Sequence, residues 1–148
     1  MTQEEKQLLL KDLCARLPYG VICVGVTYDL DDDGERYIPV KVRNTLTEIH
    51  NYTLETASVK LDLISSCKLE TIKPYLRPMS SMTKEERKEY IRERDKDKSA
   101  NMYHATYRSI DWLNKKMFDY RKDDEDKTMI EKGLALKAPE GMYNLKEK

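Results

Sequence analysis

The sequence predicts an α+β fold with an N-terminal helix, a four- to five-stranded antiparallel sheet, and then two to three C-terminal helices. Three observations support this prediction. Apolar residues recur at helical spacing before residue 18, they alternate with a period of two across residues 21–72, and capping residues precede charged or amphipathic runs after residue 82. Short links between successive strands predict a meander, which can curl into a small barrel.

The first helix is expected to begin after Thr2. Thr2 and Glu5 have the spacing of a capping box, in which each residue binds the backbone amide of the other. Its apolar face consists of Leu9, Leu10, Leu13 and Leu17, with Cys14 beside them. Pro18 and Gly20 then end the helix.

The β region is rich in β-branched residues that alternate with polar ones. Strands are expected at residues 21–28, 37–43, 48–54 and 58–64, with a short fifth strand at 68–72. The dipeptide Asp33-Gly34 predicts a hairpin turn between the first two strands. Pro39 cannot donate a ladder hydrogen bond, so the second strand is expected at an edge or a bulge.

The second half of the chain predicts helices. Residues 73–82 hold two prolines without periodicity and predict a surface loop. Thr83 and Glu86 form a second capping box before a charged helix, which is expected to fray after Arg94. Ser109 is expected to cap a third helix, and a short fourth helix is expected at residues 128–136 before a loose tail. Residues on the face of the third helix, or near it, are Ile110, Trp112, Leu113, Met117 and Phe118.

All 148 residues are expected to form one domain. Residues 1–72 form the helix and sheet, residues 73–82 the proline loop, and residues 83–148 the helical part. Charged residues make up 36% of the chain, against ~25% in typical proteins, so the core is expected to be small. The chain has equal numbers of basic and acidic residues, 27 of each, and therefore lacks a global field that would draw it to nucleic acid or an anionic membrane.

The cysteines and the N-terminus favour a cytoplasmic protein. The three cysteines form no CxxC pair and are expected to be reduced and partly buried. The N-terminus is acidic before it is apolar, unlike a signal or transit peptide. No apolar run approaches the ~20 residues of a membrane helix, so no membrane partner is expected.

No motif predicts a catalytic or cofactor site. Asp29, Asp31 and Asp33 match the opening of a calcium-binding loop, but Val40 stands where the bidentate glutamate is needed. The alternative interpretation is a solvated hairpin turn. His50 and His104 lack metal-ligand spacing, and no glycine-rich phosphate loop is present, so no cofactor is expected.

Tyrosine is the most suggestive residue type, with ten tyrosines against one phenylalanine. Tyrosine combines a large apolar ring with a polar tip and is enriched at protein interfaces. The candidate interaction residues pair aromatic rings with arginines, and they are Tyr75, Arg77, Trp112, Tyr120 and Arg121. The favoured alternative is that Trp112 and Tyr75 pack inside the domain.

Four stretches of the chain are similar to a known family. They are LLLKDLCARLPYGV at 8–21, IKPYLRPMSSMT at 72–83, SIDWLNKKMFDYR at 109–121 and IEKGLALKAPEGMY at 130–143. Together they resemble a family of short proteins of Bacteroides-type gut bacteria, their prophages and mobile elements. The run KDDEDKTM looks like an insertion relative to that family. The family has no assigned activity, so the resemblance implies a bacterial or phage cytoplasm and no functional residue.

These observations leave three hypotheses for the function. The first is a non-enzymatic accessory module that binds another protein. The second is a nucleic-acid-binding sheet whose candidate residues are Tyr28, Tyr37, Lys41, Arg43 and Lys60. The third is a hydrolase whose acidic and histidine residues are scattered along the sequence.

Overall fold

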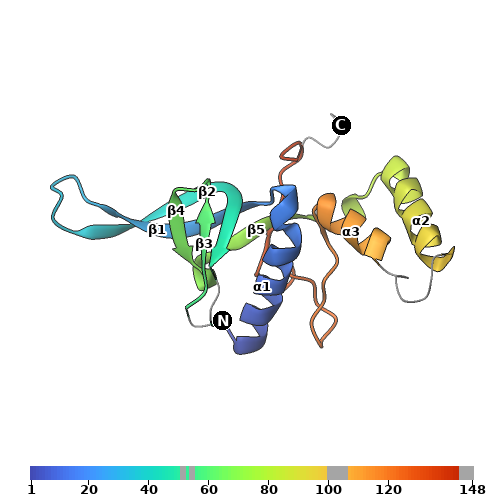
Figure 1. Ribbon diagram of the computed structural model, residues 1–148, viewed down its shortest axis with the longest axis horizontal. Helices are drawn as coiled ribbons and strands as arrows, with labels where there is room; N and C mark the ends of the chain where they lie inside the picture. Colours follow the sequence, from blue (N-terminus) through green and yellow to red (C-terminus); the bar gives the residue numbers. More distant parts are fainter. Residues whose placement is uncertain (51–52, 54–55, 100–106, 144–148) are drawn as a thin grey trace.

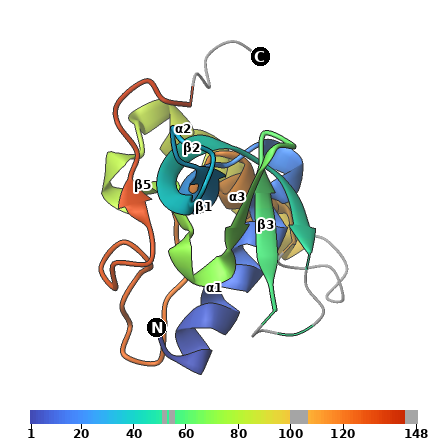
Figure 2. The ribbon, with the colours of Figure 1, turned by 90° about the vertical axis from the view of Figure 1, so that its left-hand side faces the viewer.

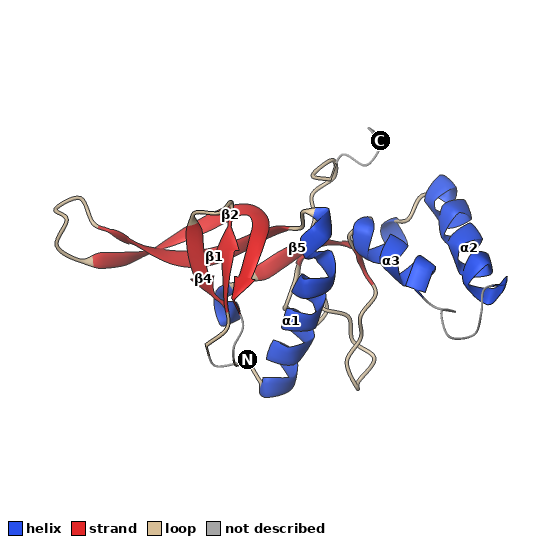
Figure 3. Cartoon of the chain, in the orientation of Figure 1, coloured by secondary structure: helices blue, strands red, loops and turns tan. Residues whose placement is uncertain are grey.

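The structure is a computed structural model that describes residues 1–50, 53, 56–99 and 107–143 (Figure 1). It confirms the α+β class and the order of an N-terminal helix, a sheet and further helices (Figure 3). The helices are α1 (Gln3–Arg16), α2 (Lys84–Ser99) and α3 (Tyr107–Lys115), with short 3-10 turns η1 (Leu17–Tyr19), η2 (Leu69–Thr71) and η3 (Met79–Ser81). The strands are β1 (Ile22–Leu30), β2 (Tyr37–His50), β3 (Ser58–Leu61), β4 (Ser65–Lys68), β5 (Lys73–Pro78), β6 (Phe118–Asp119) and β7 (Leu136–Lys137).

The sheet is larger than expected and is not closed. Its seven strands follow the order β4-β3-β2-β1-β5-β6, and β7 also pairs with β5. The strands from β1 to β4 pair antiparallel, whereas β6 and β7 pair parallel to β5. The prediction of a purely antiparallel sheet was wrong because two-residue strands are too short to carry a period-two pattern.

Several strand boundaries also differ from the prediction. The strands expected at 37–43 and 48–54 are joined in β2, which has 14 residues and a bulge between Leu46 and Glu48. The bulge bends β2 from its partner β1 toward β3, as bulges generally do, and residues 51, 52 and 54 lie outside the described part. The strand expected at 58–64 ends at Leu61, because Asp62 and Leu63 adopt positive φ angles of 54° and 63° in the turn to β4. The short strand expected at 68–72 is replaced by η2.

The proline loop expected at residues 73–82 is wrong, because its first half forms the interior strand β5. Both prolines lie where a missing amide costs no ladder hydrogen bond. Pro74 faces Cys23 of β1, whose backbone groups point toward β2, so this pair exchanges no ladder hydrogen bond. The pairing with β7 starts only at Tyr75, and Pro78 is the last residue of the strand. Proline is tolerated at such strand ends although it is excluded from strand centres.

The main core lies between α1 and the sheet. The capping box of Thr2 and Glu5 is present, and Leu9 and Leu13 are fully buried. Cys14 is exposed, contrary to prediction, and the buried face of α1 instead includes Asp12 and Arg16. The other buried apolar residues of this core come from the strands β1 to β5, from the turns between them and from the chain after α3.

A second apolar cluster joins α2 and α3. Trp112 stacks on Phe118 with ring centroids 5.8 Å apart and packs against Tyr90 of α2 at 5.7 Å. Asp97 is buried near the end of α2 and accepts hydrogen bonds from the amides of Arg108 and Ser109 in the first turn of α3.

The second cluster corrects three expectations. Because Asp97 ties α2 to α3, α2 continues beyond Arg94 and does not fray there. Ser109 lies within the first turn of α3 instead of capping it, and its hydroxyl donates to Asp97. Ile110 points away from the packed face, with 40% of its surface exposed.

The C-terminal segment replaces the expected fourth helix with turns. Asp119 accepts hydrogen bonds from the amides of Met129 and Ile130, and Gly133 adopts a positive φ of 76°. These contacts favour turns before residue 136, where β7 begins. The tail expected to be loose is anchored as far as Tyr143, whose hydroxyl donates to the carbonyl of Tyr75 at 2.8 Å.

A buried ionic cluster connects α1, α3 and β6. Asp12 and Arg16 have fully buried side chains, and Arg16 Nε donates to both carboxylate oxygens of Asp12 at 3.0 Å. Arg16 Nη2 donates to the carbonyl of Phe118 at 2.6 Å. Arg121 Nη1 donates to Asp12 at 2.7 Å and to Asn114 at 3.1 Å. One carboxylate thus holds two guanidinium groups from opposite ends of the chain.

Removal of the Asp12 charge is expected to destabilise the fold strongly. Asp12→Asn leaves Arg16 buried without a counter-ion, which typically costs about 3–5 kcal/mol. Chemical denaturation should show this loss in the free energy of unfolding. Lys6→Met removes the exposed pair of Lys6 with Glu70 at 4.0 Å and should cost less than about 1 kcal/mol. Equal effects of the two substitutions would contradict the structural role of Asp12.

A second prediction concerns the close approach of β1 to the core. A Cβ atom at Gly25 would lie 2.6 Å from Cδ1 of Ile72 and 3.0 Å from Sγ of Cys67. Gly25→Ala is therefore expected to cost about 1–3 kcal/mol of unfolding free energy through overpacking. Adding Ile72→Val removes the clashing Cδ1, so the double variant should lose less stability than the two single losses added together. Strict additivity in thermal or chemical unfolding would show that no clash exists.

Candidate functional site

The most prominent surface feature is a two-stranded arm that projects from the body of the domain (Figure 1). We call residues 26–41 the arm; it contains the outer parts of β1 and β2 and the turn between them. β1 pairs with β5 only at Cys23 and Val24, and β2 meets β3 only from Leu46 onward. Beyond these points the two strands pair only with each other, and Figure 2 views the molecule from the side of the arm.

One face of the arm carries a group of exposed apolar side chains. Leu30 pairs with Tyr37, and Tyr28 pairs with Pro39, so all four side chains lie on the same face of the ribbon. Tyr28, Leu30 and Tyr37 are 59%, 48% and 72% exposed. We call these four residues the apolar face of the arm. Large apolar side chains that cluster on a projecting element are a typical sign of an interaction site.

Charge changes sign along this face. The tip, residues 29–36, holds five carboxylates against the single guanidinium of Arg36, a net charge of −4. One of these carboxylates, that of Asp29, pairs with Ile38 and lies on the opposite face, so the turn residues supply the acidic charge at this end. Lys41 and Arg43 occupy the same face at the base of the arm, opposite Val26 and Val24. The guanidinium of Arg43 lies over the ring of Tyr75, 5.3 Å from its centroid. The face therefore runs from an acidic tip through an apolar middle to a basic base.

The structure brings together four of the five residues considered for nucleic-acid binding. Tyr28, Tyr37, Lys41 and Arg43 share one face of the ribbon. Lys60 lies on β3, where its Nζ is 3.8 Å from a carboxylate oxygen of Glu48.

The aspartates of the tip act as turn residues. Asp29 accepts a hydrogen bond from the amide of Leu30 at 2.9 Å, and Asp31 accepts one from the amide of Glu35 at 3.0 Å. The contact of Asp31 spans the turn and stabilises it, whereas Asp29 binds the neighbouring amide at the end of β1. Within the described ranges, no group of three or more His, Cys, Asp or Glu side chains is arranged to hold a metal ion, so Asp29, Asp31 and Asp33 do not form such a group.

The five aromatic and arginine candidates make contacts inside the domain. Trp112 is 8% exposed in the second cluster, and Tyr120 donates to Asn114 at 2.8 Å. Arg121 belongs to the buried ionic cluster. Tyr75 is half-buried beneath Arg43, and Arg77 connects β5 to α2. Arg77 also lines a cleft beside the start of α2.

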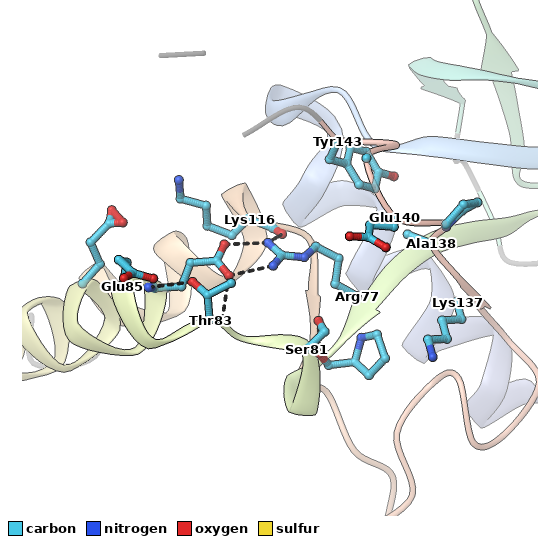
Figure 4. Close-up of a pocket in the computed structure, with 14 residues that line it drawn as sticks. Arg77, Ser81, Thr83, Glu85, Lys116, Lys137, Ala138, Glu140 and Tyr143 are labelled. Atoms are coloured by element: carbon cyan, nitrogen blue, oxygen red, sulfur yellow. Dashed lines mark hydrogen bonds and ion pairs between the residues drawn. The ribbon is translucent and has the colours of Figure 1, made fainter. Parts of the chain in front are cut away.

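This cleft lies between the end of β5, the start of α2 and residues 137–143 (Figure 4). Its volume is about 1310 Å³, and it is lined by Arg77, Pro78, Ser81, Thr83, Glu85, Glu86, Glu89, Lys116, Lys137, Ala138, Pro139, Glu140, Gly141 and Tyr143. None of these described lining residues is a cysteine or a histidine, and the Ser81 hydroxyl donates to the carbonyl of Pro78 at 2.6 Å. The cleft therefore lacks a nucleophile with an adjacent base, which hydrolytic chemistry of the serine or cysteine type requires.

Arg77 and Glu86 form the central contact of the cleft. The two guanidinium nitrogens of Arg77 donate to the two carboxylate oxygens of Glu86 at 2.7 and 2.8 Å. The Arg77 guanidinium also lies 4.2 Å from the centroid of the Phe118 ring. Partial burial alone would raise the pKa of Glu86, but hydrogen bonds from Arg77 and Thr83 outweigh it and lower that pKa. The pair holds α2 on the sheet.

The thiols and the described imidazole show no activated nucleophile. Cys23 and Cys67 are buried, and burial raises the pKa of both. Cys14 is exposed, yet partial desolvation also raises its pKa. His50 pairs with Glu48 at 3.0 Å, and His104 lies outside the described residues. A raised thiol pKa is the opposite of what a nucleophilic cysteine needs.

Comparisons of the chain with protein families, with curated proteins and with solved structures found no match in any of the three. Among the helices of the described part, none is both long and apolar enough to span a bilayer.

Sequence reasoning missed Leu30 and Pro39 of the apolar face. The signal was available in the register around the Asp33-Gly34 turn. Continuing that register pairs Leu30 with Tyr37 and Tyr28 with Pro39, and alternation then puts the four on one side.

The role of Arg77 can be tested by unfolding. Arg77→Met leaves the half-buried Glu86 without its bidentate partner and is expected to cost about 1.5–3 kcal/mol. Glu86→Gln should also destabilise at neutral pH and should flatten the acid side of the stability profile. The reason is that a lowered folded pKa contributes stability above the ordinary glutamate value of about 4.3, and this contribution disappears as pH falls through the folded pKa.

Glu93→Gln is the matched control, because Glu93 pairs with Lys96 on the surface of α2 at 3.0 Å. Its effect should stay below about 0.5 kcal/mol. If Glu86→Gln lost stability toward acid pH in the same way as the wild type, the proposed contribution of the Arg77–Glu86 pair would be ruled out.

Proposed function

We propose that this chain is a non-enzymatic accessory module of a bacterium, its phage or a mobile element, and that it binds another protein through the arm. The observation that carries the proposal is the exposed apolar face of the arm, formed by Tyr28, Leu30, Tyr37 and Pro39. Rigid tyrosines at the centre of an apolar patch are frequent hot spots of protein interfaces. The cytoplasm suits such a module, since its three cysteines are free.

The placement of the other candidates supports the choice of the arm. Trp112, Tyr120, Arg77 and Arg121 make intramolecular contacts that stabilise the domain. A partner that used them would have to compete with those contacts. The tyrosines of the arm are already exposed, so binding them requires no rearrangement of the core.

Single-stranded nucleic acid is the second candidate for the same face. Tyr28 and Tyr37 could stack on bases while Lys41 and Arg43 contact phosphates, and their common face favours this idea. The net charge of −4 at the tip opposes it, because phosphates would be repelled along half of the arm. A protein partner is therefore favoured over nucleic acid.

The proposal predicts an arm-dependent complex. A photo-crosslinking residue in place of Leu30, which is 48% exposed on the apolar face of the arm, should crosslink a discrete protein in lysate of the host. Mass spectrometry then identifies that protein, and purified components give the dissociation constant. The double variant Tyr28→Ser/Tyr37→Ser should weaken binding at least about tenfold, because hot-spot truncations cost ~1.4 kcal/mol or more.

The control is Ile64→Ser/Ile110→Ser, which replaces two exposed apolar residues outside the arm and should leave the affinity unchanged. Equal weakening by both double variants would contradict the role of the arm. Binding of single-stranded oligonucleotides at about 50 mM salt, lost in Tyr28→Ser/Tyr37→Ser, would instead establish the second candidate.

A further inference from the structure

We propose that the apolar face of the arm pairs with the same face of a second copy of the chain, in an antiparallel arrangement about a two-fold axis. This inference rests on the proposed function and deepens it, since it names the first protein that the arm binds. It is supported by three features of the arm: which backbone groups its edges present, how charge is distributed along its face, and how much area it offers.

The alternation of hydrogen-bonded and non-hydrogen-bonded pairs between β1 and β2 shows which backbone amides and carbonyls point outward from the arm. Hydrogen bonds join Asp31 to Arg36 at the turn and Leu46 to Val21 at the base, both at 2.8 Å. Hydrogen-bonded and non-hydrogen-bonded pairs alternate in an antiparallel ribbon. With the regular register of β1 and β2, the pairs Tyr28–Pro39 and Leu30–Tyr37 are therefore non-hydrogen-bonded. The residues of the apolar face thus also present their backbone groups to the two outer edges.

These edges are poorly suited to strand addition. On β1, the outward amide of Val26 donates to Thr71 Oγ1 at 3.2 Å, and that of Leu30 donates to Asp29 Oδ1 at 2.9 Å. On β2, Pro39 has no amide hydrogen, and Lys41 places a charge on the edge. Proline and lysine on edge strands are common protections against edge-to-edge pairing. The arm is therefore expected to bind through its face and not through its edges.

The charge distribution of the face is self-complementary. At one end of the face lies the tip of the arm, whose net charge over both faces is −4, and at the other end lie Lys41 and Arg43. A two-fold axis near the Tyr28–Pro39 pair places the tip of each copy against the base of the other. It also places the apolar middle of one copy against that of its partner. Such an isologous contact uses one surface patch twice, as two-fold dimers do.

The dimensions of the ribbon agree with this axis. A strand advances ~3.4 Å per residue, so Lys41 lies ~7 Å from the axis toward the base, and the turn begins at a similar distance on the other side. Lysine and arginine side chains can bridge the remaining gap. A parallel arrangement would instead bring the two acidic tips together and is disfavoured by like-charge repulsion.

The area of the face sets the expected strength. A two-stranded ribbon with one exposed face is narrow, and two such faces bury less than the ~1,200 Å² typical of stable complexes. The dimer is therefore expected to be weak and dependent on concentration. Screening of the tip-to-base contacts should weaken it further at high salt.

Sedimentation equilibrium of the purified full chain tests the proposal. Between about 5 and about 500 µM at about 50 mM salt, the chain should show a reversible monomer–dimer equilibrium. Tyr28→Ser/Tyr37→Ser should raise the dissociation constant at least about tenfold, whereas Ile64→Ser/Ile110→Ser should not change it. Unfolding curves of each variant verify that the fold is retained.

A charge exchange gives the sharper test. Lys41→Glu/Arg43→Glu makes the base acidic, and Asp32→Lys/Asp33→Lys/Glu35→Lys changes the net charge of the tip from −4 to +2. Each variant alone should therefore dimerise at least about tenfold more weakly. Mixing the two should restore dimers as heterodimers, because both ends then pair opposite charges. Heterodimers that form only at low salt support the antiparallel arrangement, and mixtures that stay monomeric overturn it.

Two other outcomes overturn the inference. A chain that stays monomeric throughout the concentration range would exclude the second copy as the partner, while arm-dependent crosslinking of another protein would leave the proposed function intact. A dimer that Tyr28→Ser/Tyr37→Ser leaves unchanged would place self-association on another surface.

Discussion

The carboxylate of Asp12 is the contact on which the arrangement of the domain depends. It lies on α1, where a regular amphipathic helix would carry another apolar residue, and it binds the guanidinium groups of Arg16 and Arg121. Through Arg16 the same cluster reaches the carbonyl of Phe118 in β6. A buried charge is tolerated only where partners compensate it, so α1, β6 and the residues after it must occupy one relative position. The cluster thus fixes the geometry, while the apolar core supplies most of the favourable burial.

Three further polar contacts extend this arrangement along the chain. Arg77 with Glu86 holds α2 on β5, Asp97 connects α2 to α3, and Asp119 organises the turn that leads to β7. Each contact fixes the relative position of two segments more precisely than sheet pairing or apolar packing would do alone. The high charge content of the chain is therefore partly internal. This explains why several arginines that resemble interface residues in the sequence contribute to the fold instead.

Local signals were sufficient to predict part of the structure. The capping box at Thr2 and the turn at Asp33-Gly34 depend on neighbouring residues only, and the structure confirms them. Strand β2 as a whole is interior in the sheet, but its stretch around Pro39 pairs with β1 alone, where a proline is tolerated. Strand β5 was hidden because Pro74 and Pro78 resemble loop residues, although both occupy positions without a ladder amide. The structural roles of Asp97 and Asp119 could not be recognised in the sequence. The backbone amides that donate hydrogen bonds to them lie 10–12 residues away along the chain. The apolar face was predicted in part. Its two tyrosines were candidate residues, but Leu30 and Pro39 could be added only once the register of β1 against β2 was known.

The arm combines two properties that need a common explanation. An exposed apolar ribbon is an aggregation hazard, because free edges and apolar side chains together favour uncontrolled strand pairing. Here Pro39, Lys41 and the side-chain acceptors Thr71 and Asp29 protect the edges, while Tyr28, Leu30 and Tyr37 stay exposed on the face. If the protected edges served only to prevent aggregation, polar residues would be expected on the face of the arm as well. Protected edges beside an exposed face are instead what a surface needs for limited, reversible contact through side chains. The change of charge along that face then determines how a partner is oriented.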